Sequence, residues 1–290
     1  MTGPARIPRA AEWMAENDTL VSRRGHRIAF RRRGTGPTVL LLHGFPTWSY
    51  DYAEMATDLA VDHNVVTMDF LGYGASEKPD SYQYSVAESA DTVEDLVGHL
   101  NLTSVRLVVH DYGGIVGQEL IDRANRGELP FTIDHLTMLN CGIVYSAYRP
   151  TRLQKLLIRP VIGKLLASQV NAARIRSALD AVRGTPLGDR EFDDLWLGMS
   201  RDNGHKLSHL LIKYNAERAV HHQRWESALA DWAGPLRLVW GLADPVSGGH
   251  VLKLAVRALP RAVVTELPGV GHYPSSEAPQ AVAAAVRESD

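Results

Sequence analysis

Asp111 is the residue whose surroundings in the sequence most favour catalytic chemistry. It follows the apolar run 107–109 and precedes Gly113 and Gly114, and a helical pattern starts immediately afterwards. A strand that turns sharply into a helix presents one side chain above the edge of a sheet, where a nucleophile can react. The usual pattern at such a turn is G-x-S-x-G, whereas Val109 and Asp111 stand at the first-glycine and serine positions here. An aspartate that caps the N-terminus of the following helix is the alternative interpretation.

Two further residues are placed to complete an acid–base pair with Asp111. Asp244 follows the apolar run 236–240, and His272 follows the next apolar run, 262–267. The carboxyl ends of parallel strands form the edge at which open α/β sheets build their sites. Alone, an aspartate before a proline is typical of a turn, and a loop histidine is typical of a polar surface. Their joint placement in the order nucleophile, acid, base favours a catalytic triad.

The elements that would position these residues are short apolar runs alternating with helical patterns. A segment at 20–33 turns at Arg24-Gly25 and predicts a hairpin at a sheet edge. Apolar residues at helical spacing follow a Ser85-x-x-Glu88 capping box and predict a helix over 86–100. The alternation predicts a mostly parallel sheet covered by helices on both faces. The predicted strands are 39–42, 65–68, 105–109, 136–139, 236–240 and 262–267.

The alternation breaks once, between about 145 and 231. This stretch has only amphipathic helical segments, for example within 153–182, and strand periodicity resumes at Leu236. We interpret 145–231 as a helical cap inserted into an α/β core formed by 1–144 and 232–290. A basic amphipathic helix carrying Lys155, Arg159 and Lys164 could instead lie on a membrane, but packing on the core is the more common role of such a helix.

Four groups of residues surround or contain these positions: His43-Gly44-Phe45-Pro46-Thr47, Asp69-x-x-Gly72-x-Gly74-x-Ser76, His110-Asp111-Tyr112-Gly113, and Gly271-His272 followed by Glu277-x-Pro279. These motifs resemble the epoxide hydrolase and haloalkane dehalogenase branch of the α/β-hydrolases, and within it especially the mesoderm-specific transcript proteins. The resemblance spans nearly the whole chain and implies the α/β-hydrolase fold, with Asp111 as nucleophile, His272 as base and Asp244 as the acid that orients it. It also implies that the backbone N–H groups of Phe45 and Tyr112 form the oxyanion hole, and that neither a metal nor an organic cofactor is needed.

An aspartate nucleophile suits attack on a saturated carbon. The carboxylate can open an epoxide or displace a halide, and either reaction leaves an alkyl ester on Asp111. His272, neutral and held by Asp244, would then activate water against that ester, which is worth about 10²- to 10⁴-fold in rate. The expected substrates are therefore a small apolar organic molecule and water.

The two reactions differ in the leaving group that must be stabilised. An alkoxide needs an O–H donor, while a halide needs N–H donors in a dry pocket. Dehalogenases of this branch usually place tryptophan directly after the nucleophile and often a polar residue after His-Gly, whereas this chain has Tyr112 and Phe45 there. Trp48 or the cap residue Trp196 could still supply an indole N–H.

Epoxide hydrolases of the branch reach the leaving oxygen with tyrosines from the cap. Tyr214 resembles one such residue, although an ordinary packing role for it is equally open. Tyr145 and Tyr148 lie close to the cap entry, so no second cap tyrosine is evident. Epoxide hydrolysis is the leading prediction and dehalogenation the alternative. Asn140, where some dehalogenases carry the triad acid, is uncharged, which favours Asp244.

Composition limits the classes of partner and location. The 290 residues carry 31 basic and 33 acidic side chains, so a formal charge of −2 predicts no nucleic-acid partner. The segment 1–18 lacks the apolar centre of a signal peptide, and no apolar run is long enough to span a membrane, so we expect a cytoplasmic protein with no membrane partner. A non-catalytic ligand-binding protein on the same fold stays possible, but a pure binder has no chemical need for all three triad residues.

Overall fold

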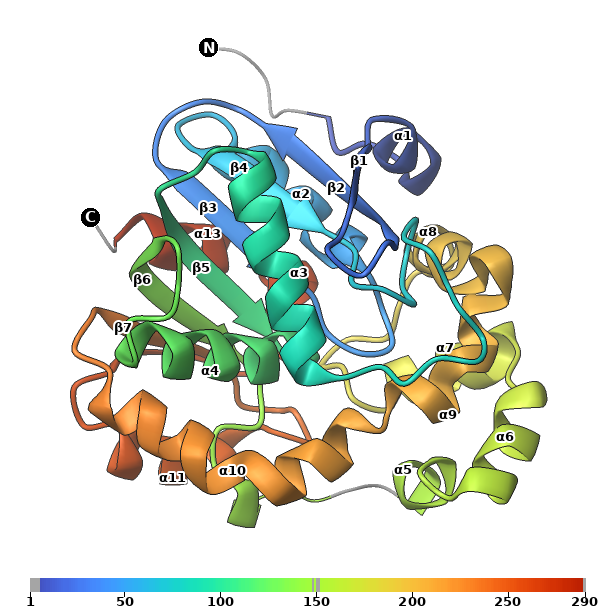
Figure 1. The fold of residues 1–290 in the computed structure, drawn as a ribbon. Helices are drawn as coiled ribbons and strands as arrows, with labels where there is room; N and C mark the ends of the chain where they lie inside the picture. The colour runs from blue at the N-terminus through green and yellow to red at the C-terminus, as the bar shows by residue number, and fades with distance from the viewer. Residues whose placement is uncertain (1–5, 148, 150–151, 289–290) are drawn as a thin grey trace.

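The sheet at the centre of the molecule has eight strands. The computed structural model describes residues 6–147, 149 and 152–288, so Tyr148 and the first five residues of segment 1–18 lie outside the described residues. The strand order is β1-β2-β4-β3-β5-β6-β7-β8; β1 and β2 pair as an antiparallel hairpin at one edge, and β3 to β8 run parallel (Figure 1). The predicted sheet is confirmed. Its strands are β1 Asp18–Val21, β2 Arg27–Arg33, β3 Thr38–Leu42, β4 Asn64–Met68, β5 Ser104–His110, β6 Thr132–Leu139, β7 Leu236–Gly241 and β8 Val263–Leu267.

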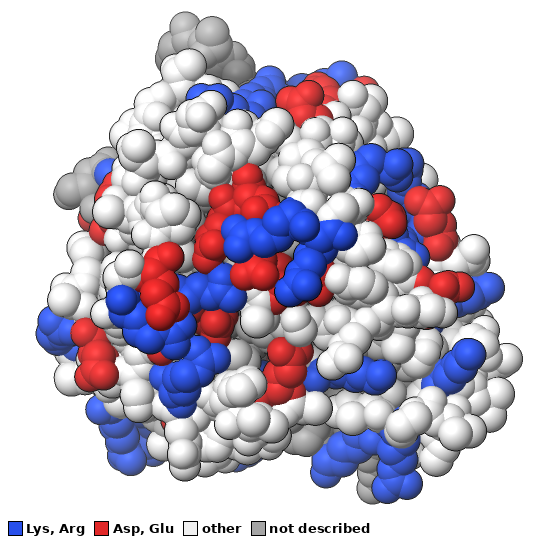
Figure 2. All heavy atoms as spheres, in the orientation of Figure 1, with Lys and Arg blue, Asp and Glu red and all other residues white. Residues whose placement is uncertain are grey.

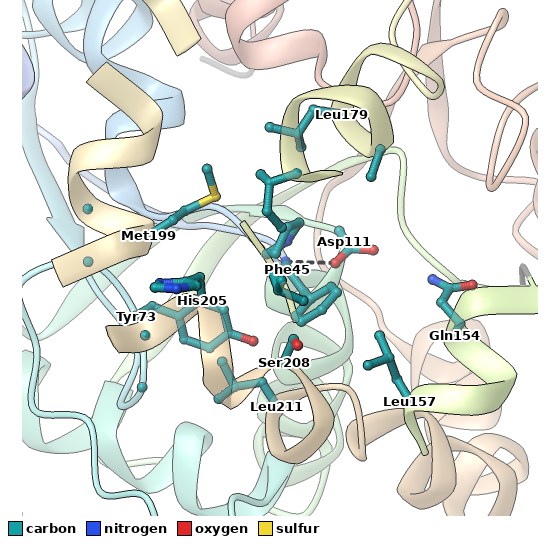
Figure 3. Close-up of a pocket in the computed structure, with 18 of the residues that line it drawn as sticks. Phe45, Tyr73, Asp111, Gln154, Leu157, Leu179, Met199, His205, Ser208 and Leu211 are labelled. Carbon is teal, nitrogen blue, oxygen red and sulfur yellow. Dashed lines mark hydrogen bonds between the residues drawn. The ribbon is translucent and has the colours of Figure 1, made fainter. Parts of the chain in front are cut away.

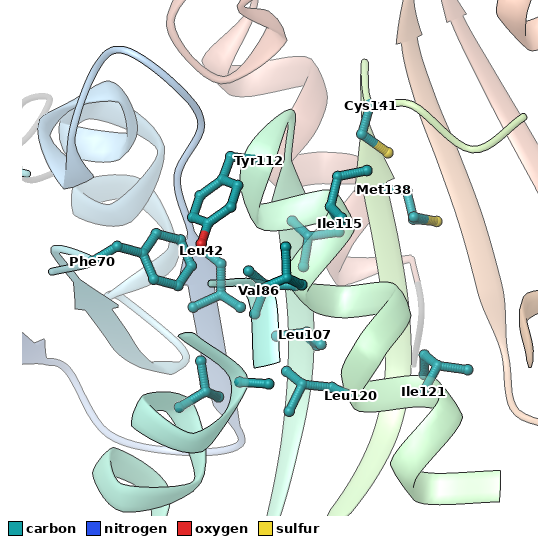
Figure 4. Close-up of a cluster of buried hydrophobic side chains, with 14 of the residues drawn as sticks. Leu42, Phe70, Val86, Leu107, Tyr112, Ile115, Leu120, Ile121, Met138 and Cys141 are labelled. Carbon is teal, nitrogen blue, oxygen red and sulfur yellow. The ribbon is translucent and has the colours of Figure 1, made fainter. Parts of the chain in front are cut away.

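The central strands are apolar because both of their faces are covered. On β3, Leu40 and Leu42 face one hydrophobic core, while Val39 and Leu41 face the other. This partition follows from the two-residue period of a strand. The first core lies between the sheet and the helices α3 Val86–His99 and α4 Tyr112–Asn125 (Figure 4). The second core includes α1 Ala10–Ala15, α2 Ala53–Leu59 and α13 Pro279–Arg287; α11 Gly249–Ala258 and the short α12 Pro274–Glu277 complete the core helices.

The start of α3 differs in part from the predicted capping box. The hydroxyl of Ser85 accepts a hydrogen bond from the backbone N–H of Glu88 at 3.2 Å, as predicted. The Glu88 carboxylate does not return to the Ser85 backbone; it accepts instead from the hydroxyl of Tyr82. Only half of the capping box therefore forms, because a nearby phenol competes for the carboxylate.

The stretch between β6 and β7 is helical, and no strand occurs among its described residues. Its last helix packs along α4, where the indole of Trp225 donates to Glu119 at 2.7 Å and the guanidinium of Arg224 pairs with Asp122. None of the helices in the described residues has the combined length and apolar content that crossing a bilayer requires. The helices of this stretch are η2 Tyr145–Ala147, α5 Arg152–Leu157, α6 Pro160–Ser168, α7 Ala172–Asp180, α8 Asp189–Ser200, η3 Arg201–Leu207, α9 Ser208–Leu211 and α10 Tyr214–Asp231. We propose to treat 145–231 as the cap and the rest as the core.

Candidate active site

Asp111 occupies a strained turn between β5 and α4. Its backbone has φ 44° and ψ −109°, a conformation that a residue with a side chain adopts only when the surrounding structure enforces it. Close packing enforces it here, because a Cβ at Gly113 would overlap the carbonyl oxygen of Leu42. The side chain of Asp111 makes no capping hydrogen bond to α4, and its Oδ1 accepts from the backbone N–H of Phe45 at 2.9 Å. The carboxylate therefore points into the site rather than capping the helix.

Asp244 and His272 meet Asp111 at the carboxyl edge of the sheet. The imidazole Nδ1 of His272 lies 2.7 Å from Asp244 Oδ2, and Nε2 lies 3.5 Å from Asp111 Oδ2. All three side chains are largely buried. Since Nδ1 faces one carboxylate and Nε2 the other, the imidazole can pass a proton at Nε2 while Asp244 holds its orientation. The loops after β5, β7 and β8 thus place the predicted nucleophile, acid and base in contact.

Asn140, at the end of β6, fixes the Asp244 carboxylate. Its side-chain amide donates to Asp244 Oδ2 at 2.9 Å and pairs with the backbone of Gly241 in both directions. The hydroxyl of Ser247 and the backbone N–H of Val246 donate to Asp244 at 2.8 and 2.7 Å. Asp244 is therefore the carboxylate that holds His272, and Asn140 supports it from the strand end where an alternative acid would lie.

Replacing Asn140 with alanine tests this support. The variant leaves Asp244 and Gly241 without their amide partner, so we expect the free energy of unfolding to fall by about 1–3 kcal/mol, measured by urea denaturation. Asn140 has φ 25°, and part of the loss could come from backbone strain. Asn101→Ala is the matched control, since Asn101 is exposed and has φ 52°. An equal loss in both variants would mean that the amide contributes nothing beyond its backbone conformation.

The imidazole of His272 and the carboxylates of Asp111 and Asp244 stabilise one another in their charged forms. Burial alone would lower the pKa of His272, but the carboxylates of Asp244 and Asp111 outweigh it and raise this pKa to about 10. Burial alone would raise the pKa of both carboxyl groups, but His272 outweighs it and holds each below its ordinary value. In the resting site His272 is thus an imidazolium between two carboxylates. A neutral group in place of the Asp111 carboxylate would remove one of those charges, lower the pKa of His272 and let it act as a base.

The donors predicted for the oxyanion hole lie next to the nucleophile. Phe45 donates its backbone N–H to Asp111, and Tyr112 is the first residue of α4, directly after it. His43 holds the Phe45 loop: its Nδ1 donates to the Gly44 carbonyl at 2.9 Å, and its Nε2 accepts from the backbone N–H of Phe70 at 3.1 Å. Burial lowers the pKa of His43, so it stays neutral and structural.

A cavity of about 170 Å³ opens above Asp111 and His272 (Figure 3). Its wall is mostly aliphatic and aromatic, and the cap supplies much of it. Such a cavity accepts a small apolar molecule and excludes most water. Its apolar lining includes Phe45, Leu157, Val170, Ile175, Leu179, Val182, Met199 and Leu211.

The three substrate-binding candidates fall in different places. Tyr214 is buried at the start of α10, lines the cavity and packs against the rings of Phe45 and Tyr112. Trp48 does not line it, because its fully buried indole turns toward α8 and donates to the Leu195 carbonyl at 3.0 Å. Trp196 does not line it either, since its ring packs beside Phe192 and His205. The prediction that an indole N–H faces the leaving group is therefore not supported.

Two hydroxyl groups that sequence reasoning did not select also belong to this site. Tyr73 and Ser208 line the cavity and are both more than nine-tenths buried, and neither hydroxyl has a hydrogen-bond partner among the described residues. Both point toward the same side of the cavity, beside Phe45 (Figure 3). Burial raises the pKa of Tyr73 well above its ordinary value, so it is a neutral O–H donor. The only sequence signal for Tyr73 is its position between Gly72 and Gly74.

The chain is similar in sequence to proteins from bacteria and mammals. It is 38% identical to the protein named "Putative hydrolase LipZ" of Mycobacterium tuberculosis H37Rv, over 96% of each chain. It is 37% identical to the human mesoderm-specific transcript homolog protein, over 85% of this chain and 76% of that protein. It is 30% identical to a haloalkane dehalogenase of Mycolicibacterium paratuberculosis K-10, over 78% of this chain and 74% of that enzyme.

Solved structures share the same fold. A loop variant of the haloalkane dehalogenase DbeA from Bradyrhizobium elkanii superposes with a TM-score of 0.78 at 22% identity, covering 94% of this chain and 97% of that one. The epoxide hydrolase CorEH superposes with a TM-score of 0.76 at 20% identity, covering 94% and 97%. The family model described as "Alpha/beta hydrolase family" matches residues 39–285. The chain therefore belongs to the alpha/beta hydrolase family.

Proposed function

We propose that this protein is an epoxide hydrolase that works through a covalent alkyl ester on Asp111. The observation that carries the proposal is the Asp111 carboxylate in an apolar cavity, in contact with a His272–Asp244 pair. A serine there would suit a carbonyl carbon, whereas a carboxylate suits a saturated carbon made reactive by ring strain or by a leaving group. The site residues of this proposal are Asp111, His272, Asp244, Phe45, Tyr112 and Tyr214, to which we add Tyr73.

The first step opens the ring. The Asp111 carboxylate attacks one ring carbon, the C–O bond breaks, and the alkoxide takes a proton from a tyrosine hydroxyl. Three tyrosines, Tyr73, Tyr214 and Tyr273, line the cavity, and we assign the donor role to Tyr214 and Tyr73. Tyr73 supplies the second O–H donor that the cap sequence lacks, and it comes from the core loop after β4.

The second step releases the product. With Asp111 neutral, the imidazolium of His272 first loses its proton to solvent. The neutral ring then takes a proton from water at Nε2, and the hydroxide adds to the ester carbonyl. The oxyanion is held by the backbone N–H groups of Phe45 and Tyr112. Collapse of this intermediate restores the Asp111 carboxylate and releases a diol. His272 keeps the proton it took from water, as in the resting site, and the tyrosinate takes back from solvent the proton that His272 released when the ester formed.

Haloalkane dehalogenation is the second candidate, and the 30% identical dehalogenase favours it. The hydrogen-bond donors that line the cavity suit a halide poorly. The indole of Trp48 is already bonded to Leu195, and Trp196 lies outside the cavity wall, so no indole N–H of either is directed at a halide. The cavity instead carries the hydroxyls of Tyr73 and Ser208, which suit an alkoxide.

Trapping the ester tests the proposal and separates the alternatives. We expect a His272→Phe variant, incubated with a panel of epoxides and haloalkanes, to gain the mass of one whole epoxide on Asp111, because the second step is blocked. Asp111→Asn within the same variant is the control and should gain nothing. An adduct equal to an alkyl group without its halogen would make the protein a dehalogenase. No adduct from any compound, with the variant folded, would favour the non-catalytic binder.

A further inference from the structure

Helix α6 in the cap displays its large apolar side chains on the outside. Its buried positions are the small residues Gly163 and Ala167. Val161 is 83% exposed and Leu165 is 66% exposed, and their spacing of four residues puts them on one face. A helix that only packs on a core shows the opposite arrangement, with large residues inward and polar ones outward.

The same surface is strongly cationic. Between 135 and 179 the sequence has seven lysine or arginine residues and no acidic residue, although the whole chain has a net charge of −2. Lys155, Arg159 and Lys164 are exposed there, and no described residue forms an ion pair with them. Some basic side chains elsewhere are neutralised, for example Arg123, which pairs with Asp91 and Glu94.

Basic and apolar side chains thus share one surface of the cap. In Figure 2 the mixed charges of α3, α4 and α10 occupy the centre of the face, while basic side chains without acidic neighbours lie at the lower right, over α5 and α6. We call this surface the cap face; it consists of Lys155, Leu156, Arg159, Val161, Ile162, Lys164 and Leu165, all exposed.

The cap face forms the outer side of the cavity wall. Gln154, Leu157 and Val170 line the cavity, and they belong to the same segment as the exposed residues. Whatever covers the cap face therefore lies one helix away from the nucleophile.

We propose that the cap face docks on the surface of an anionic lipid membrane. Apolar side chains would enter the boundary between headgroups and acyl chains, while the surrounding lysines and arginines pair with anionic headgroups. A second copy of this chain is a poorer occupant, because two such faces would bring like charges together. This proposed peripheral contact differs from the sequence-based expectation of no membrane partner, and it is independent of the reaction at Asp111. An apolar substrate dissolved in the bilayer would then reach the cavity through the cap.

Binding of the full chain to vesicles tests the proposal. We expect the protein to sediment with vesicles of equal phosphatidylcholine and phosphatidylglycerol, and not with phosphatidylcholine alone. Val161→Ser with Leu165→Ser should weaken this binding by about ten-fold or more, and so should Lys155→Gln with Arg159→Gln and Lys164→Gln. The matched control is Val61→Ser with Val220→Ser, since these side chains are 78% and 74% exposed but lie outside the cap face. The control should bind like the unmodified protein.

Ionic strength gives a second readout. Binding that depends on the cationic side chains should weaken at about 0.5 M salt, where exposed charges are strongly screened. Equal binding to neutral and anionic vesicles, or unchanged binding by both cap-face variants, would overturn the proposal. So would an absence of vesicle binding together with a dimer, seen by sedimentation velocity, that the Val161→Ser and Leu165→Ser changes dissociate. All of these positions are exposed, so thermal unfolding should confirm that the variants keep the native fold.

Discussion

Replacing Asp111 with asparagine is expected to lower kcat/KM for the substrate by about 10⁴-fold or more, because a neutral amide cannot form the ester. The change is nearly isosteric, and asparagine tolerates a positive φ as aspartate does. The loss should therefore appear in the rate and not in the fold, which circular dichroism and thermal unfolding would verify.

Asp122→Asn is the matched control for this prediction. Asp122 also lies on α4, but it pairs with Arg224 and Arg126 away from the cavity. Asp122 is buried in ion pairs but does not line the cavity, so the control should keep its activity within about two-fold. An Asp111→Asn variant that kept a tenth of the original activity would remove Asp111 from the chemistry.

Replacing His272 with glutamine is expected to stop the reaction after one turnover. Each enzyme molecule should consume one equivalent of substrate, and steady-state turnover should fall by about 10²- to 10⁴-fold, since general-base help to water is lost. Chromatographic measurement of substrate and product at high enzyme concentration would show the burst. His222→Gln, which alters a half-buried histidine paired with Glu226, is the control. Slow consumption of substrate without a rapid first equivalent would instead mean that His272 is already needed when Asp111 attacks the substrate.

The free energy of unfolding should depend on pH through His272, because the carboxylates of Asp244 and Asp111 raise the pKa of its imidazole. The raised pKa of His272, about 10, means that its ion pairs stabilise the fold fully below pH 6.5. That contribution is lost as the pH rises through about 10, so the free energy of unfolding should decline over this range.

Asp111→Asn should lower the pKa of His272, which imidazole NMR can follow. In single turnovers the second step should speed up with rising pH, because it needs neutral His272.

Much of the fold could be predicted from the sequence because its period-two and period-four patterns report burial directly. The strand predicted at 39–42 is β3 Thr38–Leu42, and its alternate residues divide between the two cores as the pattern requires. The strand at 105–109 is β5 Ser104–His110, which ends one residue before Asp111. The capping box at the start of α3 was less predictable, because the hydroxyl of Tyr82 takes the Glu88 carboxylate that the motif assigns to the Ser85 backbone.

The candidate site was predictable where a residue follows a strand, because the strand end fixes its position. Asp111, Asp244 and His272 are of this kind, and they meet in the structure. Residues set by loop and cap packing were not predictable. Trp48 lies three residues after Phe45, yet its indole turns away to Leu195. Tyr73 enters the cavity only because the loop after β4 folds under the cap.

The most direct test of a covalent Asp111 mechanism is a single turnover of the unmodified enzyme in H₂¹⁸O, with enzyme in excess over substrate. If water attacks an ester, the first product carries oxygen from Asp111, and the ¹⁸O remains in the carboxylate. Mass spectrometry of the peptide that contains Asp111 should therefore find the label there, whether the substrate is an epoxide or a haloalkane. Finding ¹⁸O in the product and none in that peptide would mean that water attacks the substrate directly, which would contradict nucleophilic catalysis by Asp111.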